Sequence, residues 1–151
     1  MEQSTNRFIR GRARRDRALL TWRNTGAVAL FLYGTSFLWL TSAFAGTGKP
    51  TEGTAWTVTQ VLVVLTVLGF SVAAWGIYRA ASWWERAVIG SAIFGFAPLI
   101  PYWVAAHAAV GAGTAAQGVA IHAVGNTLVL ILLLAPPLRH WIKHRAEGAK
   151  R

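Results

Sequence analysis

Four long stretches of the sequence contain no Asp, Glu, Lys or Arg, and they constrain the fold more than any other feature. They cover residues 26–45, 56–78, 87–109 and 115–138. An α-helix rises about 1.5 Å per residue, so about 20 apolar residues cross the roughly 30 Å hydrocarbon core of a membrane. Inside lipid the backbone must satisfy its own polar groups, and a helix does so within one segment. The sequence therefore predicts an all-α fold with four transmembrane helices.

The connectors between these stretches are short and have the composition of turns or charged links. They cover residues 46–55, 79–86 and 110–114, and the first holds Gly, Thr, Lys49 and Pro50. Short connections make consecutive helices antiparallel neighbours. We therefore expect a compact antiparallel four-helix bundle.

The positions of Lys and Arg predict the orientation of this bundle. Seven of these residues lie within 7–23, two within 79–86 and five within 139–151, while Lys49 stands alone on the opposite side. Basic loops stay in the cytoplasm. We therefore predict a multi-pass cell-membrane protein with both termini cytoplasmic, a basic tail at residues 1–25 and another at residues 139–151.

The first stretch has an alternative interpretation as a secretory signal peptide. A basic segment precedes it, and Ala43-Phe44-Ala45 before Gly46 is similar to a small-residue cleavage site. Its apolar run is about 20 residues, beyond the roughly 7–15 of a signal peptide. We interpret it as an uncleaved helix, whereas cleavage would leave three helices.

The rest of the composition excludes several kinds of chemistry. The chain has no cysteine, so disulfides, thiolate nucleophiles and Cys-ligated metals are absent. It contains no Walker lysine, HExxH motif or Ser-His-Asp arrangement, and we expect no enzymatic activity. The basic tails are expected to attract anionic lipid headgroups rather than nucleic acid. Arg far outnumbers Lys, and Ala, Gly and Val are abundant, which is typical of a GC-rich bacterial genome.

The polar residues within the four stretches form one candidate cluster, in the outer half of the bundle. It consists of Gln60, His107, His122 and Asn126. Intramembrane ionisable groups suggest function, and imidazole suits haem iron or copper. His107 and His122 would differ in depth by roughly 7 Å. We therefore favour an interfacial His107 and a His122 that forms a hydrogen bond across helices, and keep a haem or copper site as the alternative.

Two further sets of residues predict how the helices pack. Gly118, His122 and Gly125 recur at i, i+4 and i+7, with Asn126 beside them, which favours a seam against a neighbouring helix. In the third stretch, Pro98 and Pro101 each remove a backbone donor, so we expect a kink there. Freed carbonyls at such a kink can line a substrate path or can be covered by neighbouring side chains.

The segments Val58-Thr-Gln-Val-Leu-Val-Val-Leu-Thr, Trp75-Gly76 and Ile121-His-Ala-Val-Gly125 resemble a family of small bacterial four-helix membrane proteins. The resemblance covers the second to fourth stretches. It implies a four-helix fold and no particular activity.

Three functions remain open from the sequence. The first is a non-enzymatic accessory or assembly subunit that docks with a membrane-protein partner or with further copies of itself. The second is a small channel or transporter that uses the proline-kinked helix and the polar cluster. The third is a redox protein that binds haem or copper through His107 and His122.

Overall fold

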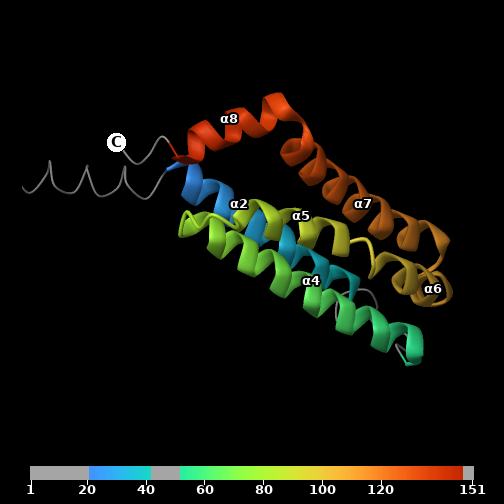
Figure 1. Ribbon diagram of the computed structural model, residues 1–151. Helices are drawn as coiled ribbons and strands as arrows, with labels where there is room; N and C mark the ends of the chain where they lie inside the picture. Colours follow the sequence, from blue (N-terminus) through green and yellow to red (C-terminus); the bar gives the residue numbers. More distant parts are fainter. Residues whose placement is uncertain (1–20, 42–51, 148–151) are drawn as a thin grey trace, which may run out of the picture.

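The computed structural model describes residues 21–41 and 52–147, and this part of the chain is helical and contains no strand (Figure 1). The predicted all-α fold is therefore confirmed for these residues. Parts of the predicted tails and of the first predicted span, namely residues 1–20, 42–45 and 148–151, lie outside them. The elements in chain order are α2 (Trp22–Ser36), the 3₁₀ helix η1 (Phe37–Leu40), α4 (Thr54–Tyr78), α5 (Trp84–Phe94), α6 (Leu99–Val110), α7 (Ala112–Leu134) and α8 (Pro136–Glu147).

Three helical stretches are long and apolar enough to cross a membrane, which is compatible with a membrane protein. They are Thr54–Tyr78, Trp84–Val110 and Ala112–Leu134, with 25, 27 and 23 residues. The second combines α5 and α6. The first predicted span, residues 26–45, begins earlier in the structure: α2 starts at Trp22, η1 ends at Leu40, and residues 42–45 lie outside the described part.

The last predicted span ends earlier than the sequence suggested. We expected a helix over 115–138, whereas α7 ends at Leu134 and Ala135 has extended backbone angles, φ −71° and ψ 116°. The residue before a proline is pushed out of the helical region, and Pro136 then starts a new helix where its missing N–H costs nothing. As a result α8 covers most of the segment that we predicted as a basic tail.

The third predicted span is interrupted at its prolines. A turn over residues 95–98 separates α5 from α6, and Pro98 is the N-cap of α6. The Phe94 carbonyl accepts a hydrogen bond from the Ala97 N–H at 2.9 Å, because Pro98 has no N–H to donate. Pro101 lies in the first turn of α6, where no intrahelical donor is needed.

The helices run back and forth; α4 contacts α2, α5 and α6, and α7 packs on α5 and α6 (Figure 1). The start of α2, the link from α4 to α5, and α8 share one end of the bundle, and the α6–α7 junction lies at the other (Figure 1). Gly111 forms this junction with a φ of 88°, a conformation that favours glycine. The core between the helices includes Phe37, Leu40, Val63, Phe70, Leu99 and Tyr102.

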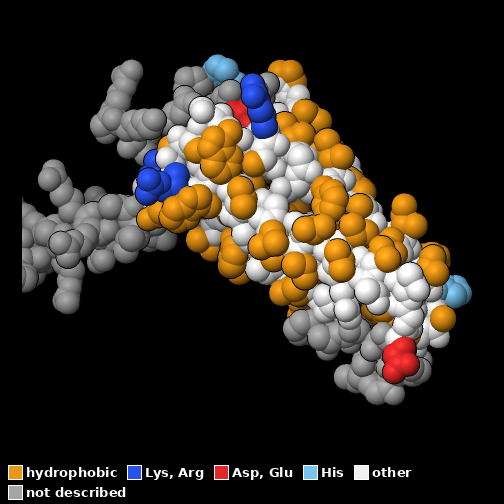
Figure 2. Space-filling view, turned by 60° about the horizontal axis from the view of Figure 1, so that its bottom comes forward, with side chains coloured by type: hydrophobic (Ala, Val, Ile, Leu, Met, Phe, Trp, Pro, Cys, Tyr) orange, Lys and Arg blue, Asp and Glu red, His pale blue; other side chains and the backbone are white. Residues whose placement is uncertain are grey.

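The outer surface of the bundle is apolar along its length. Large hydrophobic side chains are exposed on α2, α4, α5, α6 and α7, and Figure 2 shows them along the visible face, with Lys and Arg side chains gathered toward one end. Among the described side chains that carry charge, Arg79, Glu85 and Arg86 lie at or next to the α4–α5 link, and Glu52 precedes α4 at the opposite end. This distribution is compatible with a bundle that lies in a membrane.

Candidate functional site

A buried polar cluster joins α2 to α7 in the interior of the bundle. The Tyr33 hydroxyl lies 2.8 Å from Asn126 Oδ1 and 3.2 Å from the His122 main-chain oxygen, and it donates toward both. Asn126 is completely buried and His122 is 5% exposed. We call these three residues, together with Ser36, the α2–α7 polar cluster.

The imidazole of His122 is held between two main-chain carbonyl groups. Its Nδ1 lies 2.9 Å from the Gly118 oxygen, one turn earlier on α7, and its Nε2 lies 3.2 Å from the Ser36 oxygen. A carbonyl can only accept, so each contact is a hydrogen bond only when that ring nitrogen carries a hydrogen, and a neutral imidazole donates to one of the two carbonyls. The Ser36 hydroxyl is 3.5 Å from Nε2 and donates to the main-chain oxygen of Tyr33 at 2.6 Å. His122 therefore connects the last turn of α2 to α7 through protein groups alone.

Aromatic rings close the cluster off on the side of α4. The ring of Phe37 meets the His122 ring edge-on, with centroids 4.5 Å apart. Phe70 of α4 lies 5.2 Å from the Tyr33 ring and 5.9 Å from the Phe37 ring, measured between centroids. Phe37 and Phe70 are fully buried, so the polar groups face a dry surround in which their mutual hydrogen bonds gain strength.

Two glycines of α7 allow this close approach. A Cβ built on Gly125 would lie 2.5 Å from Tyr33 Cε2, and a Cβ on Gly118 would lie 2.8 Å from the Tyr102 hydroxyl oxygen. Both distances are shorter than a van der Waals contact permits. The seam predicted along Gly118, His122 and Gly125 is therefore the face of α7 that contacts α2 and α6.

One polar group of the cluster lacks a partner. Asn126 Nδ2 is buried and forms no hydrogen bond within residues 21–41 and 52–147. It faces the interruption between α5 and α6, because a Cβ on Gly95 would lie 2.7 Å from it. An unsatisfied buried donor costs about 1–3 kcal/mol. The helix break at residues 95–98 and the orphaned amide thus lie side by side.

The four polar residues that we predicted as one cluster are divided by the structure. His122 and Asn126 share the α2–α7 polar cluster, whereas His107 is exposed on the last turn of α6, with its ring 5.4 Å from that of Trp103. Gln60 lies half-buried on α4. In the described parts of the chain, no three His, Cys, Asp or Glu side chains gather as a metal site.

Sequence reasoning missed Tyr33 and Ser36. Both lie in the first apolar stretch, and their hydroxyl groups were the available signal. The rotation of α2 determines whether these groups face lipid or protein, and packing alone sets that rotation. Nothing in the sequence pattern indicates that Tyr33 would lie against Gly125.

No family model, curated protein or solved structure matches the chain. The resemblance to small bacterial four-helix membrane proteins stays a prediction.

Proposed function

We propose that the chain is a bacterial cell-membrane protein with four transmembrane helices and both ends in the cytoplasm. Together α2 and η1 extend about 30 Å, since an α-helix rises about 1.5 Å and a 3₁₀ helix about 2.0 Å per residue. That length matches the hydrocarbon core. With α2 and η1 as the fourth span, the start of α2, the α4–α5 link and α8 lie at one end of the bundle. The sequence has its Lys and Arg residues in and next to these segments.

Within this membrane, we propose that the protein is a non-enzymatic accessory or assembly subunit that docks through the outer face of α7. The observation that carries the proposal is the one-sided packing of α7. Along the most apolar part of α7 only 17% of the residues are buried, compared with 33% along α4 and 39% along the α5–α6 stretch. Its exposed face begins with small residues, Gly113, Ala116 and Ala120, which allow a second helix to approach closely.

The contacts of the α2–α7 polar cluster also support a non-enzymatic function, because its polar groups hold α2 and α7 together. Tyr33, Ser36 and His122 bond to one another, to Asn126 or to main-chain carbonyls. Interhelical hydrogen bonds of this kind stabilise membrane bundles by about 0.6 kcal/mol on average. A haem iron or a copper ion that bound His122 would have to displace a contact of the His122 ring nitrogens. The redox hypothesis therefore ranks last.

The runner-up function, a small channel or transporter, has one specific observation in its favour. The buried Asn126 amide faces the break between α5 and α6 without a partner among the described residues. Interrupted membrane helices with free polar groups form solute sites in transporters. A path of this kind would have to admit water to Asn126.

Photocrosslinking tests the docking proposal. A photoreactive residue at Ala120 in native membranes is expected to form a discrete protein adduct, because this position faces outward from α7. The same residue at Ala29, which is exposed on α2, serves as the control and should give lipid adducts only. The mass of the adduct identifies the partner, and a second copy adds 16.4 kDa.

A further substitution makes the result specific to the surface. Ala116→Leu places a larger side chain one turn away on the same face, and it should abolish the adduct from position 120 by separating the helices. Lipid adducts alone from positions 116, 120 and 124 would contradict docking through α7.

A further inference from the structure

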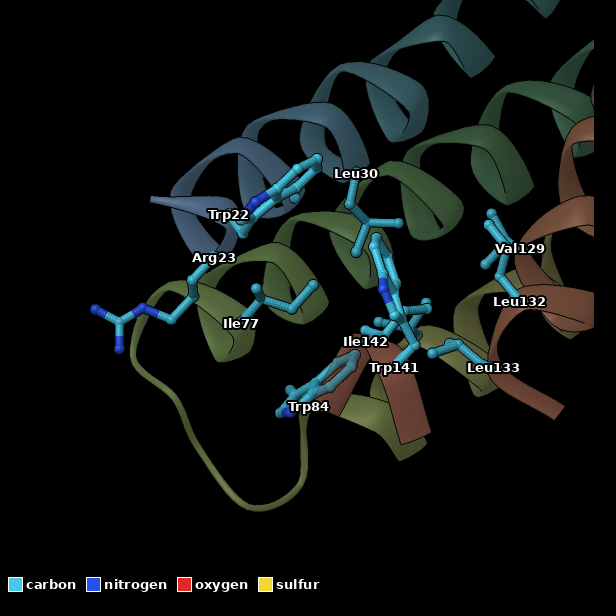
Figure 3. Close-up of a pocket in the computed structure, with 12 residues that line it drawn as sticks. Trp22, Arg23, Leu30, Ile77, Trp84, Val129, Leu132, Leu133, Trp141 and Ile142 are labelled. Atoms are coloured by element: carbon cyan, nitrogen blue, oxygen red, sulfur yellow. The ribbon is translucent and has the colours of Figure 1, made fainter. Parts of the chain in front are cut away.

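An apolar cavity of about 250 Å³ lies where α2, α4, α5, α7 and α8 converge. It is at the end of the bundle that carries the start of α2 and α8 (Figure 1). Figure 3 shows side chains from these five helices around it, with Leu30 above, Trp84 below and Leu132 at the right in this view. The cavity is smaller than the roughly 300–1,000 Å³ of a typical small-molecule site, and its walls are hydrocarbon and indole.

Two features of the sequence create this space. The break at Pro136 turns α8 back toward α2, so that the ring of Trp141 meets that of Trp22 edge-on with centroids 6.0 Å apart. Gly26 of α2 lines the cavity, and a Cβ built there would meet no atom within 4 Å. A side chain at position 26 would therefore extend into free space rather than into a neighbouring helix.

Among the side chains that the structure describes, Arg23 is the charged one that lines the cavity. Its Nε is buried and has no hydrogen-bond partner among the residues that the structure describes. Figure 3 shows the guanidinium directed outward from the apolar walls. A guanidinium presents planar donors that match phosphate oxygens. Arg23 thus supplies a phosphate-binding group beside a hydrocarbon-lined space.

We propose that this cavity binds one acyl chain of an anionic phospholipid, whose phosphate is bound by Arg23. The apolar walls select hydrocarbon, and the small volume suits one chain rather than a bulky ligand. The Lys and Arg residues of the two predicted basic tails and of the α4–α5 link favour an anionic headgroup. Trp22, Trp84 and Trp141 fit the level of the headgroups, where indole rings accumulate. The inference rests on the proposed insertion into a membrane, and not on docking through α7.

The test uses the full-length chain in vesicles of phosphatidylglycerol and phosphatidylcholine that contain a trace of phosphatidylglycerol with a photoreactive acyl chain. Label is expected on cavity residues of α2 and α8. Gly26→Leu fills the cavity and should reduce this label by about tenfold or more. Gly90→Leu on α5 is the matched control, since a Cβ built on Gly90 also meets no atom within 4 Å and this residue does not line the cavity; it should leave the label unchanged.

Arg23→Gln tests the binding of the headgroup separately from the binding of the acyl chain. It should remove the preference for the phosphatidylglycerol probe over a phosphatidylcholine probe with the same chain, while label from both probes still reaches the cavity. Equal labelling of the Gly26→Leu and Gly90→Leu proteins, or no label in the cavity of the wild-type protein, would overturn the proposal. Flotation of the protein with the vesicles reports membrane insertion separately, so a failure of the proposed insertion is recognised as such.

Discussion

Gly34→Leu is expected to reduce the free energy of unfolding of the bundle by about 3 kcal/mol or more, because it forces extra volume into a filled core. Gly34 is buried where α2 crosses α4, and a Cβ built on it would lie only 2.5 Å from Phe70 Cβ and 3.2 Å from Phe70 Cγ. Phe70 Cβ is attached directly to the backbone of α4, so a rotamer change cannot move it away. The two helices would have to separate.

Gly26→Leu on the same helix is the matched control. Its side chain enters free space, so the free energy of unfolding should change by less than about 1 kcal/mol, the difference in helix propensity included. Unfolding in mixed detergent micelles, followed by tryptophan fluorescence, gives both values. An equal loss of stability in the two variants would mean that α2 does not cross α4 at Gly34.

Asn126→Asp is expected to cost about 3 kcal/mol, the penalty that a central Asp carries in a membrane helix. The substitution preserves the shape of the side chain and its acceptor for the Tyr33 hydroxyl. It replaces the amide nitrogen, which has no hydrogen-bond partner among the described residues, by an oxygen at a completely buried position beside Gly95. Either a buried charge or a buried protonated carboxyl results.

Gln117→Glu makes the same chemical change near the start of α7, at an exposed position, and should reduce the free energy of unfolding much less, because it lies close to the end of the span rather than at the helix centre. The same micelle assay measures both variants. A stable Asn126→Asp protein, equal to Gln117→Glu, would show that water reaches Asn126. That outcome would favour the channel or transporter function over the accessory subunit.

The parts of the fold that depend on local sequence could be predicted. Long uncharged segments specify helices because lipid offers the backbone no other partner, and Pro98 marks the interruption between α5 and α6. The end of α7 was signalled by Pro136, but uncharged residues up to Leu138 masked the signal. The sequence analysis also did not predict α8, because the basic residues of this segment were interpreted only as a signal for membrane topology.

The candidate site depended on facts that the sequence does not contain. His107 and His122 both lie in apolar stretches, yet one is exposed beside Trp103 and the other is held between α2 and α7. The difference arises from the rotation of each helix about its axis, which packing sets. The cavity beside Gly26 was equally hidden, since it depends on α8 turning back toward α2.

The central claim is that the chain crosses the membrane four times with both ends in the cytoplasm, and cysteine labelling tests it most directly. The sequence has no cysteine, so Ser4→Cys, Thr51→Cys, Ser82→Cys, Gly113→Cys and Gly148→Cys each introduce one thiol. With a membrane-impermeant maleimide on intact cells, Thr51→Cys and Gly113→Cys should be labelled. The other three should be labelled only after lysis. Labelling of Ser4→Cys in intact cells would show that α2 and η1 do not cross the membrane, and would contradict the four-span account.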